Sequence, residues 1–166
     1  MKNLMYVKGV VLVFCAFLTL SCDEEEASVD LRETWELEVE QVATATAHYV
    51  DFQMALQDSL IDVSGYVPNM GHHYLNPSLV DGTFELEKPE IILYVPDGNG
   101  GMKMVAVEYA VVPADPSNPG SPPEGFTGDL DKWHFNENIG EWQLHVWTIL
   151  ENPDGVFAMF NPEIGD

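Results

Sequence analysis

Two apolar segments joined by a glycine-rich turn constrain the fold more than any other feature of this sequence. The first, residues 90–96, reads Glu-Ile-Ile-Leu-Tyr-Val-Pro, and the second, residues 102–112, is a longer run of mainly apolar residues. Residues 97–101 between them read Asp-Gly-Asn-Gly-Gly. Glycine and asparagine supply the positive φ angles that a hairpin loop requires. The sequence therefore predicts two antiparallel strands joined by a tight hairpin.

Other segments have weaker strand and turn signals. Residues 141–150 form a third strand-like run, and residues 83–86 form a short strand candidate behind an Asp-Gly turn. Residues 66–77 are predicted to be an ordered loop or a short extended segment. The five prolines and two glycines of residues 113–125 predict an irregular surface loop. Residues 126–138 mix aromatic and turn-forming residues and have no predicted strand.

A long helical pattern precedes the strands. Apolar or small residues recur every three or four positions from Leu31 to Leu60, which is the period of one helix face. Asp30 and Glu33 have the spacing of a capping box. The pattern predicts one helix over residues 31–58 with Asp30 as its N-cap. One long N-terminal helix packed on a mostly antiparallel sheet makes the predicted fold α+β.

The N-terminus has the composition of an export signal. Lys2 and Lys8 lie in a head without acidic residues, residues 9–20 are apolar apart from Thr19, and four acidic residues follow Cys22. A basic head followed by a short apolar core is typical of a secretory signal peptide. The apolar run is shorter than the roughly 20 residues that a membrane-spanning helix needs. An uncleaved short anchor is the alternative.

The end of this signal resembles the lipobox of bacterial lipoproteins. The matching residues are Leu18-Thr19-Leu20-Ser21-Cys22, with threonine where leucine is usual. The resemblance implies that Cys22 is lipidated and becomes the first residue of the mature protein. The acidic run after it resembles the export signal that some bacterial lipoproteins use to reach the cell surface.

These features predict a signal peptide at residues 1–22, an acidic tether at 23–29 and a single α+β domain at 30–166. Lipid on Cys22 would hold the protein on a membrane of the cell envelope outside the cytoplasm, at the outer membrane or the cell surface. The sequence names neither the leaflet nor a small-molecule or protein partner.

Charge and cysteine content exclude several classes of function. All 28 acidic residues follow Cys22, and four of the six basic residues do so, which gives that part a net charge of −24. Such a surface repels polynucleotides, so we expect no nucleic-acid partner. It promotes solubility and concentrates divalent cations. Because the two cysteines, Cys15 and Cys22, precede residue 23, the domain has no disulfide and no cysteine nucleophile.

Isolated polar residues occupy two of the predicted strands. Strand alternation places Glu108 on one face with Met104, Ala106 and Ala110. A carboxylate in an apolar strand needs a cation, a metal ion or a hydrogen-bond donor unless the strand lies at an edge and Glu108 faces water. His145 lies among large apolar residues of another strand, so we expect it to be at least half buried, as a hydrogen-bonded histidine or a ligand.

Two adjacent histidines and one loop histidine complete the set. His72 and His73 point in opposite directions in an extended segment, so at most one of them enters a given site. His134 follows Trp133 in a region without predicted structure. The sequence has no His-Glu-x-x-His, EF-hand, phosphate-loop or Gly-x-Ser-x-Gly motif. It therefore identifies no catalytic residue and leaves open whether the protein is an enzyme.

Four short motifs resemble a family of uncharacterised bacterial secreted proteins and lipoproteins. They read Met70-Gly71-His72-His73-Tyr74-Leu75-Asn76-Pro77, Val107-Glu108-Tyr109, Leu144-His145-Val146-Trp147 and Asn152-Pro153-Asp154-Gly155-Val156-Phe157. The resemblance implies that His73, rather than His72, acts together with Glu108 and His145. It implies no activity.

Two or three histidines with one carboxylate suit zinc, iron, manganese or copper. We therefore predict that His73, Glu108 and His145 form a divalent transition-metal site. Accessory candidates are His134, Asn76 and His72. In an enzyme, Glu108 or a metal-bound water would supply the base, and the loop at residues 113–125 would be a candidate lid.

Two alternatives remain at this point. In the first, the protein is a non-enzymatic binding or envelope-structure module, and its His/Glu cluster is a buried hydrogen-bond network. In such a module, an apolar or carbohydrate surface would bind through Trp133, Trp142 and Trp147. In the second, surface carboxylates capture calcium weakly at several sites.

Overall fold

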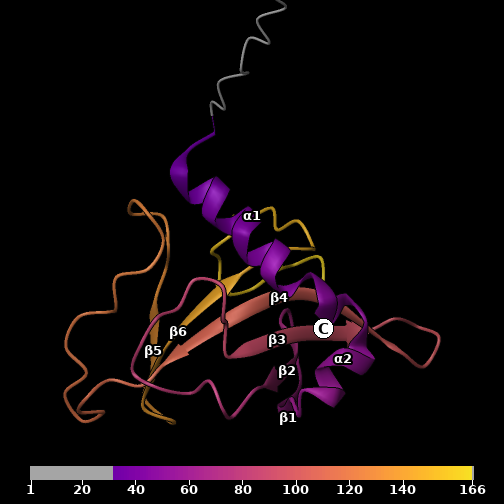
Figure 1. The fold of residues 1–166 in the computed structure, drawn as a ribbon, viewed down its shortest axis with the longest axis horizontal. Helices are drawn as coiled ribbons and strands as arrows, with labels where there is room; N and C mark the ends of the chain where they lie inside the picture. Colours follow the sequence, from indigo (N-terminus) through magenta and orange to yellow (C-terminus); the bar gives the residue numbers. More distant parts are fainter. Residues whose placement is uncertain (1–31, 166) are drawn as a thin grey trace, which may run out of the picture. The chain divides into compact units, whose positions relative to one another are not determined.

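The computed structural model describes residues 32–165. Cys22, the acidic tether and Asp30 lie outside this range. The described elements are α1 (Thr34–Thr46), the 3₁₀ helix η1 (Ala47–Val50), α2 (Phe52–Gln57), β1 (Ile61–Val67), β2 (Gly71–Leu75), β3 (Ile91–Pro96), β4 (Met102–Val111), β5 (His134–Asn136) and β6 (Glu141–Val146), as Figure 1 shows. None of the helices in this range has the length and apolar character needed to cross a membrane.

The predicted helix is present but not continuous. α1 and η1 together make one helical segment of 17 residues, and α2 is a separate helix of six residues. The prediction of a single helix over residues 31–58 is wrong at Asp51, which is extended and whose carboxylate accepts from the N–H of Gln53 at 3.0 Å. An aspartate side chain that binds its own backbone competes with the helical hydrogen bonds, so it starts α2.

The start of α1 also differs from the prediction. Glu33 occupies the N-cap position, and its N–H donates to the Glu36 carboxylate at 2.8 Å. The helix begins at Thr34, three residues later than the pattern predicted, because the capping residues lie closer to the strongly periodic part of the chain.

The six strands form one curled antiparallel sheet in the order β1-β2-β3-β4-β6-β5. The predicted hairpin is confirmed: β3 pairs with β4, and the N–H of Asp97 donates to the carbonyl of Gly101 at 3.0 Å. The predicted α+β class is therefore correct.

Two strand predictions were wrong and one was correct in part. Residues 83–86 form no strand, because Asp81 and Thr83 make a side-chain turn with a hydrogen bond of 2.7 Å. Residues 66–77, predicted as a loop or short extended segment, contain the end of β1 and the short extended segment β2. β5 lies in the segment without predicted structure. β1 and β5 are the edges of the sheet, and edge strands with exposed side chains lack a clear apolar alternation.

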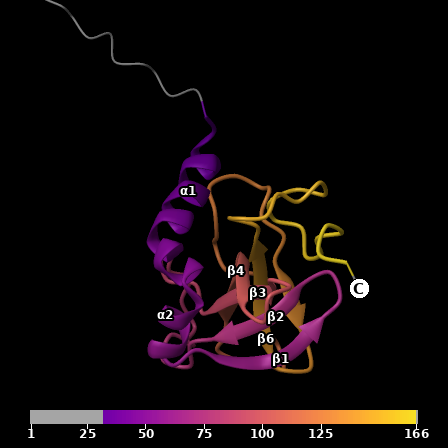
Figure 2. The ribbon, with the colours of Figure 1, turned by 90° about the vertical axis from the view of Figure 1, so that its right-hand side faces the viewer.

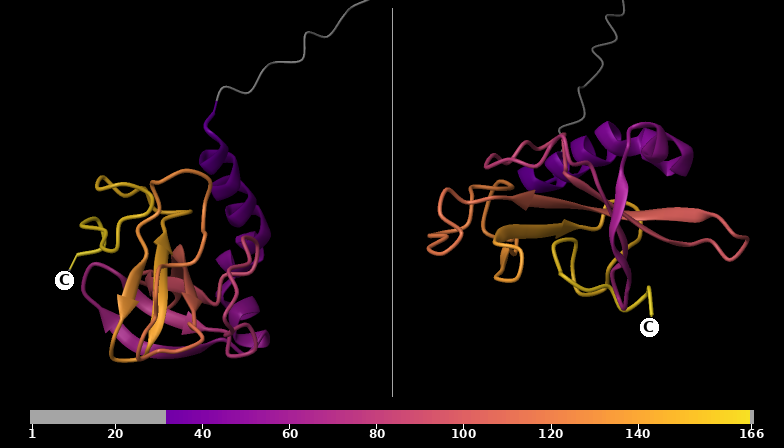
Figure 3. Two further views of the ribbon diagram at one scale, coloured as in Figure 1. Left: turned by 90° about the vertical axis from the view of Figure 1, so that its left-hand side faces the viewer. Right: turned by 90° about the horizontal axis from the view of Figure 1, so that it is seen from below.

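The two faces of the sheet bury different clusters. α1 and α2 cover one face, where Val42 and Ala55 pack with Tyr94, Tyr109 and Leu144. On the other face, the core consists of Ile91, Leu93, Val105, Ala106, Ala110 and Trp147. Figures 2 and 3 show the helices on one side of the sheet and much of the C-terminal segment on the other. The three predicted ligands, His73, Glu108 and His145, belong to this second face.

A bulge in β4 changes the predicted alternation. Leu93 pairs with Ala106 but Tyr94 pairs with Met104, so Val105 has no opposite residue. Met104 consequently packs on the helical face, whereas Ala106 and Ala110 stay on the other face. The prediction that Met104 shares a face with Ala106 is therefore wrong, because the extra residue of a bulge reverses the side-chain direction beyond it.

Gly71 is the first residue of β2, the strand that carries His73. We predict that Gly71→Ala destabilises the protein by about 3 kcal/mol. Its φ is +94°, and an added Cβ would lie 2.5 Å from the carbonyl oxygen of Tyr94. Urea denaturation measures the loss. Gly98→Ala is the matched control, since Gly98 has a φ of +79° but open space around its Cβ position. It should cost only about 1 kcal/mol, and equal losses would contradict the clash.

Candidate metal centre

Three strands carry the three predicted ligands to one point on the face away from the helices. Glu108 on β4 lies directly opposite His145 on β6 in the antiparallel register. His73 on β2 pairs with Leu93 on β3, so its side chain reaches over β3 to meet Glu108. The curl of the sheet makes this possible, because in a flat sheet β2 and β6 would lie three strand spacings apart, or about 14 Å.

The side chains of the three residues meet through their nitrogen and oxygen atoms. Nε2 of His73 lies 3.4 Å from Oε2 of Glu108, and Nε2 of His145 lies 3.6 Å from the same oxygen. One donor atom from each residue lies within 4.8 Å of the others. The exposed fractions are 8% for His73, 0% for Glu108 and 5% for His145, so bulk water does not solvate the group.

These distances exceed those of charge-assisted hydrogen bonds between an imidazole and a carboxylate. Charge-assisted N–H···O bonds measure about 2.7–2.9 Å. Within residues 32–165, neither oxygen of Glu108 nor Nε2 of His145 has a hydrogen-bond partner. A tetrahedral ion with bonds of about 2.1 Å places neighbouring ligand atoms about 3.4 Å apart. The spacing in this cluster therefore suits three ligands of one ion.

Ser64 on β1 orients the His73 ring. Its hydroxyl donates to the carbonyl of Gly65 at 2.6 Å, so its oxygen accepts from the backbone N–H of His73 at 3.1 Å and from the ring Nδ1–H at 2.9 Å. Nε2 then carries the lone pair that faces Glu108, which is the tautomer a ligand needs. Ser64 was missed at the sequence level, because β1 itself was not predicted.

Burial controls the protonation of the group. It lowers the pKa of His73 to about 4 and, together with the neighbouring His73 and His134, lowers that of His145 to about 3. Burial also raises the pKa of Glu108 well above its ordinary value, with Glu141 and Glu90 adding repulsion. At neutral pH both imidazoles are unprotonated and available as ligands. A cation bound beside Glu108 would favour the carboxylate form.

The accessory candidates occupy different places. His134, at the start of β5, lines the same cavity as the three central residues. His72 points to the other face, where its Nδ1 lies 2.8 Å from Oδ2 of Asp62. Asn76 uses its Oδ1 to cap a turn, accepting from the N–H and hydroxyl of Ser78. The structure therefore brings His134, but not His72 or Asn76, to the central group.

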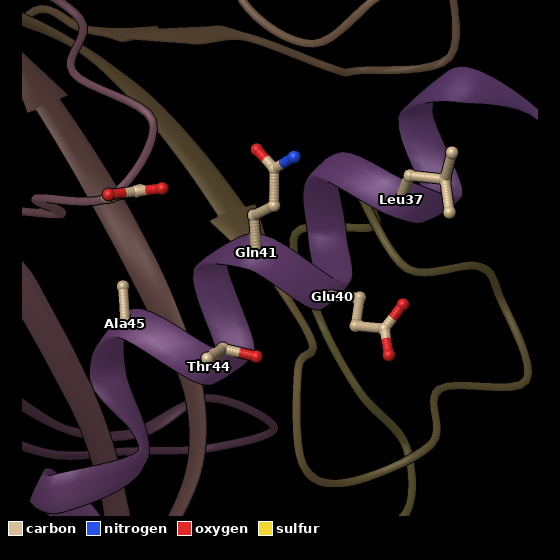
Figure 4. A pocket seen from close by; sticks show the side chains of 6 residues that line it. Leu37, Glu40, Gln41, Thr44 and Ala45 are labelled. Carbon is tan, nitrogen blue, oxygen red and sulfur yellow. The ribbon is translucent and has the colours of Figure 1, made fainter.

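The central group lies in the wall of a cavity of about 520 Å³. A hollow of about 440 Å³ lies along α1, where Leu37, Gln41 and Thr44 line it (Figure 4). Another, of about 660 Å³, lies among the loop residues 122–133. Among the residues that the structure describes, only the cavity of about 520 Å³ is lined by histidines and a carboxylate at metal-binding spacing.

The proline-rich loop does not cover this cavity. Residues 113–125 contribute none of its lining side chains in the described chain. The carbonyl of Pro119 instead accepts from Nε1 of Trp142 at 3.5 Å. Trp142 is the strand neighbour of Gln143, so it points to the opposite face of β6. The loop is therefore not placed as a lid for the His/Glu cluster.

Glu90 is a second buried acid near the centre. Its carboxylate accepts from the N–H of Ala110 at 2.9 Å. It replaces the backbone partner that β4 lacks beyond Ile91, where β3 begins. Burial raises its pKa to about 7. Between the ordinary value of 4.5 and pH 7, the folded protein thus keeps a proton that the unfolded chain has lost.

The raised pKa of Glu90 predicts how the free energy of unfolding depends on pH. Because the folded state binds more protons in this window, Glu90 lowers the free energy of unfolding as the pH rises from 4.5 to 7. Relative to Glu90→Gln, we expect the wild type to lose about 2–3 kcal/mol between pH 4.5 and pH 8. Urea denaturation in chelator at several pH values measures the difference. A difference that does not change with pH would contradict the assignment.

Comparison with known proteins adds no relative: no protein-family model, curated protein or solved structure matches this chain. The function must therefore be argued from the geometry of the His73, Glu108 and His145 cluster.

Proposed function

We propose that the protein is an extracytoplasmic lipoprotein that binds one divalent transition-metal ion through His73, Glu108 and His145. The observation that carries the proposal is a group of buried donor atoms at ligand spacing, in which the Glu108 oxygens and the His145 Nε2 have no other partner among residues 32–165. A buried carboxylate without a partner is costly, and an ion removes that cost.

The composition of the group narrows the ion. Two imidazoles and one carboxylate suit zinc, iron, manganese or copper, and they are poor ligands for calcium, which prefers six to eight oxygens. Three protein ligands leave at least one coordination position free, as in catalytic rather than structural zinc sites. In such a site the ion supplies Lewis acidity or an activated water, which suits metal-assisted hydrolysis or oxygen chemistry.

The hydrogen-bond-network alternative is less well supported. Such a network stabilises a core only when every member is satisfied, whereas the contacts of Glu108 are 3.4 and 3.6 Å long. Trp147 is also only 5% exposed, so its ring cannot form part of a carbohydrate surface. Nε1 of Trp133 donates to Asp131, that of Trp142 to Pro119 and that of Trp147 to Ala158.

Metal analysis tests the ligand set. The purified wild type should contain about one transition-metal ion per chain, by elemental analysis after incubation with zinc, iron, manganese and copper in turn. His73→Ala, Glu108→Ala and His145→Ala should each lose most of it. His72→Ala is the matched control and should keep the ion, since His72 points to the other face. A wild type that stays metal-free would refute the proposal and favour the network alternative.

The envelope location is part of the proposal and rests on the lipobox resemblance at Cys22. Expressed in a bacterium that processes lipoproteins, the full chain should incorporate labelled palmitate and sediment with membranes. Cys22→Ser should lose the label, because serine offers no thiol for acylation. Equal labelling of both proteins would contradict lipidation at Cys22.

A further inference from the structure

The cavity beside the His/Glu cluster has two chemically different walls. The apolar wall comes from β1, β2, the β5–β6 turn and the C-terminal segment, and includes Val63, Val67, Met70, Leu75, Ile139 and Met159. The polar wall comes from β5 and β6 and contains His134, Asn136, Glu141 and Gln143. His73, Glu108 and His145 line the same cavity as these apolar and polar residues. A cavity of about 520 Å³ with this composition has the size of a small-molecule site.

The polar wall is held in place by its own hydrogen bonds. Nδ2 of Asn136 donates to Oε1 of Gln143 at 3.1 Å, and Nε2 of Gln143 donates to Oε1 of Glu141 at 3.3 Å. The register of β5 and β6 places these residues side by side, because Asn136 pairs with Glu141 and His134 with Gln143. Much of the hydrogen-bonding capacity of the wall is therefore used internally.

The charges of the cavity select against ions of either sign. No Lys or Arg of residues 32–165 lines it, whereas Glu108 and Glu141 do, so an anion would find no side chain to neutralise it. Once an ion is bound, a cation would find no carboxylate left to neutralise it. A metal charge of +2 is balanced by Glu108 and by Glu141 nearby. The cavity is thus close to neutral when loaded.

From these walls and charges we infer that the cavity admits a small neutral molecule with an apolar body, and that one nitrogen or oxygen of that molecule takes the open position on the ion. This inference rests on the proposed metal site. The apolar wall would bury the body of the molecule, and the ion would bind its donor atom. The inference names a ligand class and no reaction.

Three imidazole probes separate the contribution of an apolar body to binding from that of a negative charge. Their binding to the full chain loaded with cobalt(II) is measured by the visible absorption of the cobalt ion. 4-Phenylimidazole is neutral at pH 8 and has an apolar body, imidazole lacks the body, and 4-(imidazol-4-yl)benzoate adds a negative charge. Burial of the phenyl ring should make 4-phenylimidazole bind at least about 10-fold more tightly than imidazole. The benzoate should bind more weakly than 4-phenylimidazole.

A charge placed in the apolar wall provides the second test. Val63 is 52% exposed on the edge strand β1, so Val63→Lys should fold while placing an ammonium group at the cavity. It should narrow or reverse the preference for 4-phenylimidazole over the benzoate, with an unchanged cobalt spectrum. Val50→Lys is the matched control, because Val50 is 57% exposed on η1 and does not line the cavity.

The outcomes distinguish this inference from the metal site itself. A cobalt spectrum that is absent, or that persists in His145→Ala, would overturn the proposed function and the inference together. A cobalt spectrum that depends on His145 but shows equal affinities, tightest binding of the benzoate, or no response to any probe would overturn the inference alone. A preference for 4-phenylimidazole that Val63→Lys weakens and Val50→Lys preserves would support it.

Discussion

The carboxylate of Glu108 is the group on which the second face of this sheet depends. It is fully buried in the longest strand, between two alanines and opposite His145. An ionised carboxylate in such a place costs several kcal/mol unless a positive charge or several donors compensate it. The described residues supply two imidazole nitrogens at 3.4 and 3.6 Å and no hydrogen bond. The geometry of the group can hold a metal ion, which would supply that positive charge.

The rest of the fold brings two strands to that carboxylate. β6 is adjacent to β4 and needs only the correct register. β2 is separated from β4 by β3, so the curl of the sheet and the length of the His73 side chain bridge the gap. The helices pack on the opposite face and fill it with apolar and aromatic side chains, which leaves the concave face for the polar group. Ser64 then fixes the ring of His73 from the edge strand.

The central residues could be chosen from the sequence because strand alternation makes an isolated charge conspicuous. Glu108 interrupts a long apolar strand, and His145 lies among large apolar residues of a shorter one. The choice of His73 over His72 came from the family resemblance. Ser64 gave no such signal, because β1 is an edge strand whose side chains are mostly exposed. The bulge at Val105 was equally hidden, since one extra residue in an apolar run leaves the composition unchanged.

By itself, the sequence determined the α+β class, the β3–β4 hairpin, the apolar strands around Glu108 and His145, and a strongly negative net charge. These properties follow from local periodicity, turn chemistry and net charge, which short stretches of chain encode. Only the tertiary structure decided that the helix breaks at Asp51, that β2 lies within reach of β4, and that three donor atoms meet beside a cavity. Those outcomes depend on strand order, register and sheet curl, which arise from contacts between residues far apart in the chain.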